Sequence, residues 1–249
     1  ASCLVGSEMC IRDRYYKFKG RLIEILRRAV VKSLNYNLGF KSRCKHANLI
    51  LCKTENHRAI IPAKFRQKAI LFTDVAVDAL PVKSFVSIEN KDRVNYIVVG
   101  KLDPWRGFDL LIEAFAGAVT THKNIHLKIV GKGLDSKRLK QLITTKKLSE
   151  YIEMTGEVSM NDYYKLMNEA DVVINPSLKE GAVTTSFDSM ALGKPLICID
   201  NTGYTRYFSN DYAIVLPMQK REPLIASLKA AILKFTNPRE RIKIGANSK

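Results

Sequence analysis

The chain has 249 residues, of which 46% are hydrophobic and 26% charged, and this is the composition of an ordinary folded protein. A disordered or collagen-like chain is therefore excluded. No uncharged apolar run approaches the roughly 20 residues needed to cross a bilayer, so we expect no membrane-spanning helix. With 41 basic and 24 acidic side chains the formal net charge is +17, which favours anionic partners such as phosphorylated small molecules, nucleic acids or lipid headgroups.

The five cysteines are scattered and form no Cys-x-x-Cys pair. This pattern fits a reducing compartment and predicts neither a disulfide framework nor a zinc site. Cys44 and His46 have the spacing of a ligand pair, but no second pair follows them. We therefore expect no metal site and interpret Cys44 as a plain buried thiol.

The two ends of the chain have no pattern typical of a folded domain. Residues 1–14 lack the basic segment and apolar run of a secretory signal. Residues 3–14 resemble a translated sequencing adapter, so we expect residues 1–14 to be a non-native leader. At the other end we expect residues 237–249 to be a truncated tail, and hence the chain to be a fragment.

Residues 15–34 are expected to form a basic amphipathic helix, because apolar residues recur there every three or four positions with lysine and arginine between them. Two interpretations stay open: a surface helix packed on a core, and a helix lying on anionic lipid. Strands are expected at 48–52 and 68–72, with a helix over 54–61 between them. Residues 79–92 read as a linker.

From residue 93 to 236 strands and helices alternate regularly. This predicts an α/β domain with a Rossmann-like, doubly wound parallel sheet, which binds ligands beyond the carboxyl ends of its strands. The expected strands cover 94–99, 126–130, 151–154, 172–175, 195–199 and 213–216, and the expected helices 107–119, 135–147, 160–169, 184–192 and 221–235.

The loop after the first of these strands, Gly100 to Gly107, carries two cations. Lys101 and Arg106 would lie at a strand end beside a helix N-terminus, where side-chain cations and the helix dipole together suit a diphosphate. A solvated turn with two ordinary surface cations stays open as the alternative.

The next two loops give weaker signals. Gly131-Lys132-Gly133 lacks the third glycine of a dinucleotide motif, so a turn is the better interpretation. In Gly156-Glu157-Val158, backbone groups beyond a strand end are available to pair with a nucleobase edge.

The loop from Asn175 to Asp188 is the most informative. It combines the carboxylates Glu180 and Asp188 with the start of a helix whose free N–H groups attract anions. Carboxylates accept hydrogen bonds from sugar hydroxyls and N–H groups bind phosphate, so this loop suits a nucleotide sugar. The alternative is a helix-capping Glu180 with Asp188 on the surface.

Taken in order, these motifs, together with residues 171–177 and 190–195, resemble the C-terminal donor-binding domain of GT-B glycosyltransferases, and more closely family 4, the retaining group 1 transferases. The resemblance covers about residues 94–216. It is weaker over 45–78, where residues 47–51 resemble the last strands of the N-terminal domain. The resemblance thus implies that 15–78 is a remnant of the Rossmann-like acceptor domain and 93–236 the donor-binding domain.

The resemblance also implies roles for individual residues. Lys101 and Arg106 would hold the donor diphosphate, Glu180 the donor sugar and Asp188 the ribose hydroxyls. Asp188 is one methylene shorter than the family's usual Glu. The catalytic residues would be Arg106, Lys101 and Glu180, and the donor-binding residues Gly100, Gly131, Glu157, Val158, Gly181, Ala182, Val183, Thr184, Thr185 and Asp188.

The position after the first acid departs from the family pattern. Ala182-Val183 replaces the usual Phe-Gly, and a side chain at 183 would crowd the backbone approach to the sugar. Donor identity and the shape of the site therefore stay open.

The implied reaction moves a sugar with retention from a UDP- or GDP-sugar donor to a hydroxyl of a saccharide or lipid-linked acceptor. It needs no metal and no cofactor. The usual setting is bacterial surface polysaccharide synthesis, in the cytoplasm or at the inner face of the plasma membrane, where an anionic surface would attract the basic helix. The fragment alone is expected to be inactive.

Three alternatives stay open: a sugar-nucleotide epimerase of the same fold, an inactive sugar-nucleotide-binding module and a basic nucleic-acid binder. No nucleic-acid recognition motif occurs in the sequence, so nucleic acid is not an expected partner.

Overall fold

A computed structural model describes residues 38–52, 55–72, 93–178, 184–200, 205, 208 and 211–246. The expected leader 1–14, the helix expected over 15–34 and the expected linker 79–92 lie outside these residues, and the domain boundaries remain predictions. None of the helices in the described ranges is long and apolar enough to pass through a bilayer.

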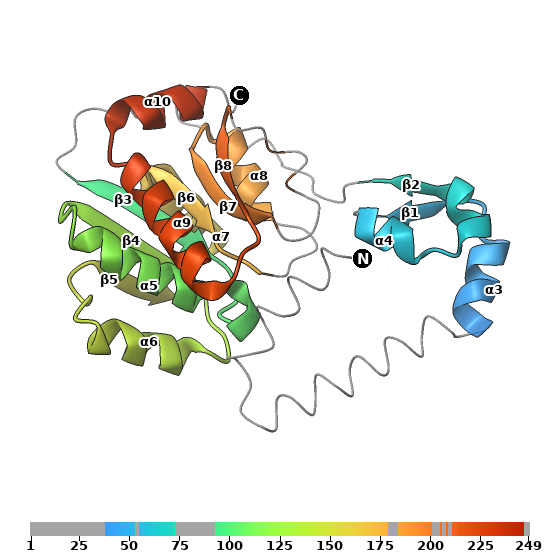
Figure 1. Ribbon diagram of the computed structural model, residues 1–249, viewed down its shortest axis with the longest axis horizontal. Coiled ribbons are helices and arrows are strands. Elements are labelled where there is room, and N and C mark those ends of the chain that lie inside the picture. The colour runs from blue at the N-terminus through green and yellow to red at the C-terminus, as the bar shows by residue number, and fades with distance from the viewer. Residues whose placement is uncertain are drawn as a thin grey trace.

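The first part of the described chain contains a pair of parallel strands, β1 (Ile50–Cys52) and β2 (Ala69–Leu71), in which Ile50 faces Ala69. Helix α4 (Glu55–Ile60) and the 3-10 helix η1 (Ala63–Lys68) connect them (Figure 1). The expected strand–helix–strand order is thus confirmed. Helix α3 (Leu38–His46) precedes them and was not predicted, because among the side chains described at 39–46 only Cys44 is buried and the apolar pattern is correspondingly weak.

The second part is built on a six-stranded parallel sheet. Its strands are β3 (Val94–Val99), β4 (Ile125–Val130), β5 (Ile152–Gly156), β6 (Val172–Asn175), β7 (Leu196–Asp200) and β8 (Ala213–Pro217). They lie in the order β5-β4-β3-β6-β7-β8. The chain therefore builds the sheet outward in one direction from β3 and then in the other from β6, which confirms the doubly wound fold and places its topological switch point between β3 and β6.

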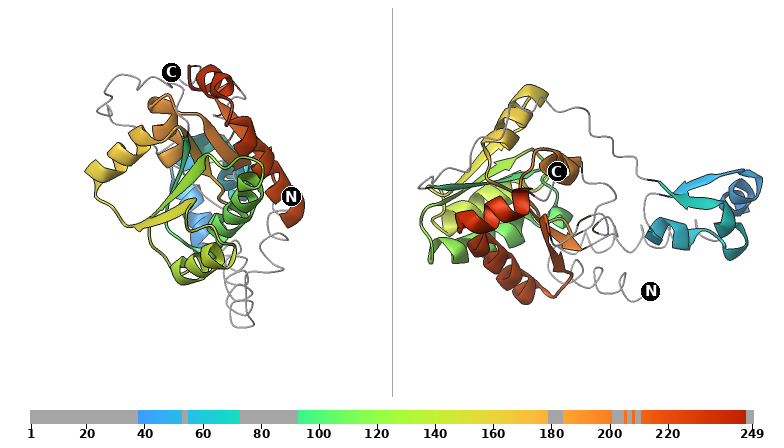
Figure 2. Two further views of the ribbon diagram at one scale, coloured as in Figure 1. Left: turned by 90° about the vertical axis from the view of Figure 1, so that its left-hand side faces the viewer. Right: turned by 90° about the horizontal axis from the view of Figure 1, so that it is seen from above.

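Helices cover both faces of this sheet. Helices α5 (Phe108–Val119), α6 (Ser136–Thr145) and α9 (Arg221–Lys234) lie on one face, and α7 (Met160–Glu169) and α8 (Thr184–Ala191) on the other (Figure 2). Strand β6 shows why the strands read as unbroken apolar runs: Ile174 packs into the core under α5 and α9, while its neighbour Val173 packs under α7.

The segment expected as a tail contains a further helix, α10 (Pro238–Ala246). Its Ile244 joins the main core, and its buried Arg241 donates hydrogen bonds from Nη1 to the carbonyl oxygens of Phe235 and Thr236 at 2.6 and 3.0 Å. These bonds satisfy carbonyls at the C-terminal end of α9, where the helix cannot satisfy them itself. Helix α10 is therefore part of the packed domain.

Candidate functional site

Three loops at the carboxyl edge of the sheet are joined by backbone hydrogen bonds. Gly100 N donates to Val130 O at 3.0 Å, Leu102 N to Lys132 O at 3.1 Å and Gly131 N to Gly156 O at 2.8 Å. At Gly131 φ is +132°, and a Cβ there would lie 2.0 Å from Gly100 O. The loops after β3 and β4 therefore cross so closely here that position 131 has no room for a side chain, which supports the interpretation of Gly131-Lys132-Gly133 as a turn. The contact of Gly131 with a ligand remains a prediction.

The loops on the two sides of the switch point also meet. Leu178 N, in the loop after β6, donates to Trp105 O, in the loop after β3, at 3.1 Å. Gly107 has φ of +69° and packs its Cα face against the carbonyl of Pro176. The loop carrying the two predicted diphosphate ligands is therefore fixed against the loop that leads to α8.

Lys101 and Arg106 lie in this loop, the second of them in the 3-10 helix η2 (Pro104–Arg106) that leads into α5. The Lys101 side chain is 66% exposed, and its Nζ lies 3.5 Å from Oδ2 of Asp103, which is only 3% exposed. Arg106 is half-buried. Burial lowers the pKa of its guanidinium, and the charge of Asp103 opposes this shift. Arg106 thus lies two residues before the positive end of α5, and Lys101 lies directly after β3 and Gly100 with a largely exposed ammonium group. Cations at these positions are suited to binding phosphate oxygens.

The loop after β5 contains the residues predicted to meet a nucleobase. Glu157 is exposed and Val158 half-buried. Ser159 caps α7 directly after them, its Oγ accepting from Asp162 N at 3.2 Å. The cap fixes where α7 begins, and so fixes the loop relative to the first turn of that helix.

In the loop before α8, Glu180, Gly181, Ala182 and Val183 lie outside the described residues. The described Thr184 and Thr185 begin α8. One end of this helix is fastened to β6 by a hydrogen bond from Asn175 Nδ2 to Ser186 Oγ at 3.2 Å.

Asp188 is buried, at 5% exposure, so its interpretation as a surface residue is wrong. One of its carboxylate oxygens, Oδ2, accepts a hydrogen bond from the hydroxyl of Tyr163 on α7 at 2.5 Å. Burial raises the pKa of the Asp188 carboxyl, and the bond from Tyr163 opposes this shift. Sequence reasoning missed Tyr163, because a partner 25 positions away on another helix leaves no periodic signal.

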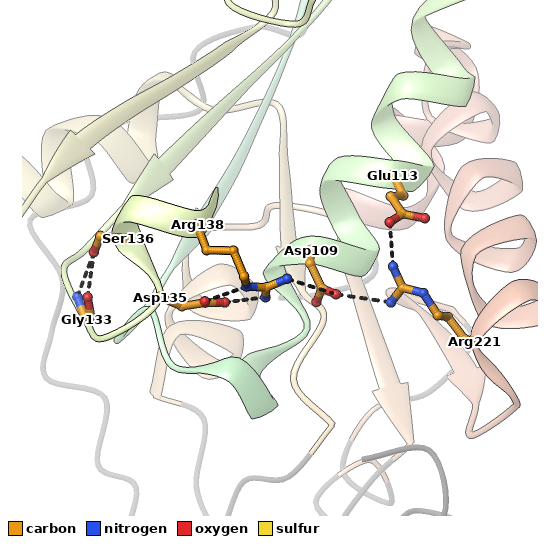
Figure 3. A network of polar contacts seen from close by, with 7 residues as sticks. All are labelled: Asp109, Glu113, Gly133, Asp135, Ser136, Arg138 and Arg221. Atoms are coloured by element: carbon orange, nitrogen blue, oxygen red, sulfur yellow. Dashed lines mark hydrogen bonds and ion pairs between the residues drawn. The ribbon is translucent and has the colours of Figure 1, made fainter. Parts of the chain in front are cut away.

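A network of charges around Asp109 was also missed (Figure 3). Asp109, buried in the first turn of α5, lies 3.1 Å from Arg221 Nη1 and 3.9 Å from Arg138 Nη1 through its Oδ2. Arg138 also forms a bidentate pair with Asp135, and Arg221 donates to Glu113 at 2.5 Å. These contacts join the N-terminal ends of α5, α6 and α9, and so fix the first turn of α5, in which Asp109 lies three residues after Arg106.

Metal ligands do not gather anywhere in the ranges that the structure describes: no three His, Cys, Asp or Glu side chains come together there. Cys44 is a buried free thiol, as expected, and so are Cys52 and Cys198. That the reaction needs no metal remains a prediction.

Comparison with known proteins matches residues 81–248 to the family described as "Glycosyl transferases group 1". An uncharacterized glycosyltransferase of Haemophilus influenzae is 27% identical over 154 residues, covering 61% of this chain and 41% of that protein. The alpha-monoglucosyldiacylglycerol synthase of Acholeplasma laidlawii is 30% identical over 155 residues, covering 60% of this chain and 37% of the synthase.

Among solved structures, the pneumococcal O-GlcNAc transferase in complex with UDP and GlcNAc superposes with a TM-score of 0.72 at 17% identity, covering 86% of this chain and 43% of that one. At this identity the superposition shows the shared GT-B fold. The chain spans about two fifths of the length of the curated relatives it matches.

Proposed function

Because the chain belongs to the group 1 glycosyl transferases, we propose that it carries the donor-binding part of an enzyme that moves a sugar from a nucleoside-diphosphate sugar to an acceptor hydroxyl with retention. The acceptor pocket would come from the acceptor domain, of which residues 15–78 would be the remnant. Bacterial surface polysaccharide synthesis, on saccharide or lipid-linked acceptors near the inner membrane face, is the setting we propose.

One observation carries the proposal. Lys101 follows β3 at the switch point of a doubly wound sheet, and Arg106 lies two residues before α5, the place where such sheets bind phosphorylated ligands. Because Gly107 packs against Pro176, the same loop is held next to the approach to α8, where the donor sugar is expected. A diphosphate on the cations and a sugar beside α8 would fit one extended ligand.

The chemistry follows from where charge develops. Breaking the bond between sugar and diphosphate leaves more negative charge on the diphosphate in the transition state than in the bound donor. Lys101, Arg106 and the dipole of α5 therefore stabilise the transition state more than the ground state, which is the condition for catalysis. In this proposal Lys101 and Arg106 stabilise the charge on the leaving diphosphate, and no metal is needed.

UDP is the first ligand to test, since the pneumococcal transferase of the same fold was solved in complex with it. The experiment is a calorimetric titration of the chain with UDP, GDP and ADP in EDTA, repeated with Lys101→Ala and Arg106→Ala. Lys146→Ala, at an exposed lysine after α6, is the control for loss of one positive charge.

We expect saturable binding of one nucleotide, weakened by roughly 10-fold or more in each cation variant, because hydrogen bonds to charged groups contribute about 1.5–3 kcal/mol. The control should bind as the wild type does. A folded chain that binds no nucleotide, or binds equally well without Arg106, would contradict the proposal.

A further inference from the structure

A buried polar pair joins the two helices on the α7–α8 face of the sheet. Tyr163 belongs to the first turns of α7 and Asp188 to the middle of α8, and the Tyr163 hydroxyl donates to Asp188 Oδ2 at 2.5 Å. Both side chains are buried. Burying a carboxylate costs free energy that a single hydrogen bond only partly offsets.

Packing alone does not account for this pair. The Tyr163 ring lies in the second apolar cluster with Met167 and Val173, a place that a phenylalanine ring would fill equally well. The Tyr163 hydroxyl therefore adds one feature only, a hydrogen-bond donor directed at Asp188. A fixed carboxylate at this position calls for an explanation from function.

The positions of Tyr163 and Asp188 in the fold indicate a role in binding the donor nucleotide. Tyr163 lies one turn after Ser159, which caps α7 and directly follows the predicted nucleobase loop at Glu157 and Val158. Asp188 lies on α8, whose N-terminus borders the predicted sugar site. The hydrogen bond between Tyr163 and Asp188 therefore links α7, which follows the loop expected to meet the base, with α8, which begins beside the site expected for the donor sugar. The ribose of the donor lies between these two sites, because it joins the base to the diphosphate that carries the sugar.

We propose that Tyr163 is a positioning residue that fixes the Asp188 carboxylate to accept hydrogen bonds from the ribose hydroxyls of the donor nucleotide. The inference rests on the proposed function and deepens it, since it adds a residue that orients the predicted ribose ligand Asp188. A carboxylate has about four acceptor sites on its two oxygens, so the bond from Tyr163 leaves capacity for ribose hydroxyls.

The shorter side chain at position 188 explains the need for such a residue. Asp has one methylene fewer than Glu. Its carboxylate therefore reaches less far and has one rotatable bond fewer with which to adjust its position. A rigid donor that holds the carboxylate in one orientation lowers the cost of ordering it when the ligand binds.

The test compares UDP with 2′-deoxy-UDP by calorimetry, using the whole chain and the Tyr163→Phe variant. Tyr164→Phe is the matched control, because that ring contacts Tyr163 with centroids 5.1 Å apart and is half-buried. We expect the wild type and the control to bind UDP more tightly than 2′-deoxy-UDP. In Tyr163→Phe the ratio of the two affinities should fall about 2- to 10-fold, mainly through weaker UDP binding, which is the effect of one ordinary hydrogen bond.

Asp188→Asn supplies the second variant. If Tyr163 acts through Asp188, then adding Tyr163→Phe to Asp188→Asn should lower the ratio little further, so the two effects should not add. A ratio unchanged by Tyr163→Phe, or equal weakening of both nucleotides, would overturn the inference and leave the proposed function standing. Failure of the folded wild type to bind UDP would overturn both.

Discussion

Gly107 and Pro176 touch through their backbones: a Cβ added at position 107 would come within 2.1 Å of the Pro176 carbonyl oxygen. Gly107 follows Arg106 in the loop after β3, and Pro176 begins the loop after β6. The contact therefore sets the spacing of the two loops at the switch point, and it depends on the absence of a side chain at one position.

Gly107→Ala is expected to destabilise the protein more than Gly156→Ala. Both glycines have positive φ, +69° and +78°, but a Cβ at 156 would meet nothing within 4 Å. Gly156→Ala should therefore cost only the backbone strain, about 1–2 kcal/mol, and Gly107→Ala about 1–3 kcal/mol more for the clash. Urea unfolding of both variants measures this, and equal losses would contradict the contact described for Gly107.

Asp109→Ala is expected to be costly because it leaves Arg138 and Arg221 without their shared buried carboxylate. Arg138 is 47% exposed and partly hydrated, so we expect about 2–4 kcal/mol, somewhat below the full effect of breaking a buried pair. Glu113→Ala, at the more exposed end of the network, should cost at most about 1 kcal/mol. Chemical denaturation of the two variants checks the difference, and a Glu113 effect as large as that of Asp109 would show the network to be wrongly described.

Asp188→Asn is expected to raise the free energy of unfolding at pH 7 while weakening the preference for ribose. Burial raises the pKa of Asp188, so the folded state disfavours its ionised form. The associated loss of stability begins as the pH rises past the ordinary pKa of a carboxyl group and ends once the pH exceeds the raised folded pKa, and an uncharged Asn escapes it. Denaturation at pH 7 and pH 4 checks this, since the gain should shrink at the lower pH. A variant less stable than the wild type at both values would contradict it.

Alkaline pH is expected to destabilise the fold through its buried thiol and phenols. Burial raises the pKa of Cys198 from 9.0 to about 12, and it raises the pKa of Tyr96 as well. Above pH 9 the unfolded chain releases the thiol proton while the folded chain keeps it, so stability falls toward pH 12 by up to ~1.4 kcal/mol per pH unit for this group. Cys198→Ala should flatten the decline measured by urea unfolding between pH 9 and 10.5, and an unchanged slope would count against a buried protonated thiol.

The sequence was sufficient for the regular part of the fold. Strands β3 and β6 were predicted to the residue, because sheets covered on both faces need unbroken apolar runs such as Val172 to Ile174. Helix α10 was not predicted, since its segment has few apolar residues and is anchored instead by the buried Arg241, whose partners are carbonyl oxygens.

For the candidate site, the sequence identified the loops and missed what holds them. Lys101 and Arg106 stand out as cations at a strand end, a local signal. The ion pair of Asp109 with Arg221 spans 112 positions and the bond of Tyr163 to Asp188 spans 25. Such partners are chosen by tertiary packing, and neither spacing nor periodicity in one sequence reveals them.

The measurement that tests the central claim most directly is hydrogen–deuterium exchange with and without UDP, which locates the bound nucleotide on the chain. We predict slower exchange in the loop Gly100–Gly107, at residues 156–158 and in the first turns of α8, no change in α3, β1 and β2, and loss of the effect in Arg106→Ala. Protection elsewhere on the chain, or protection that persists without Arg106, would contradict a donor site at the switch point of the sheet.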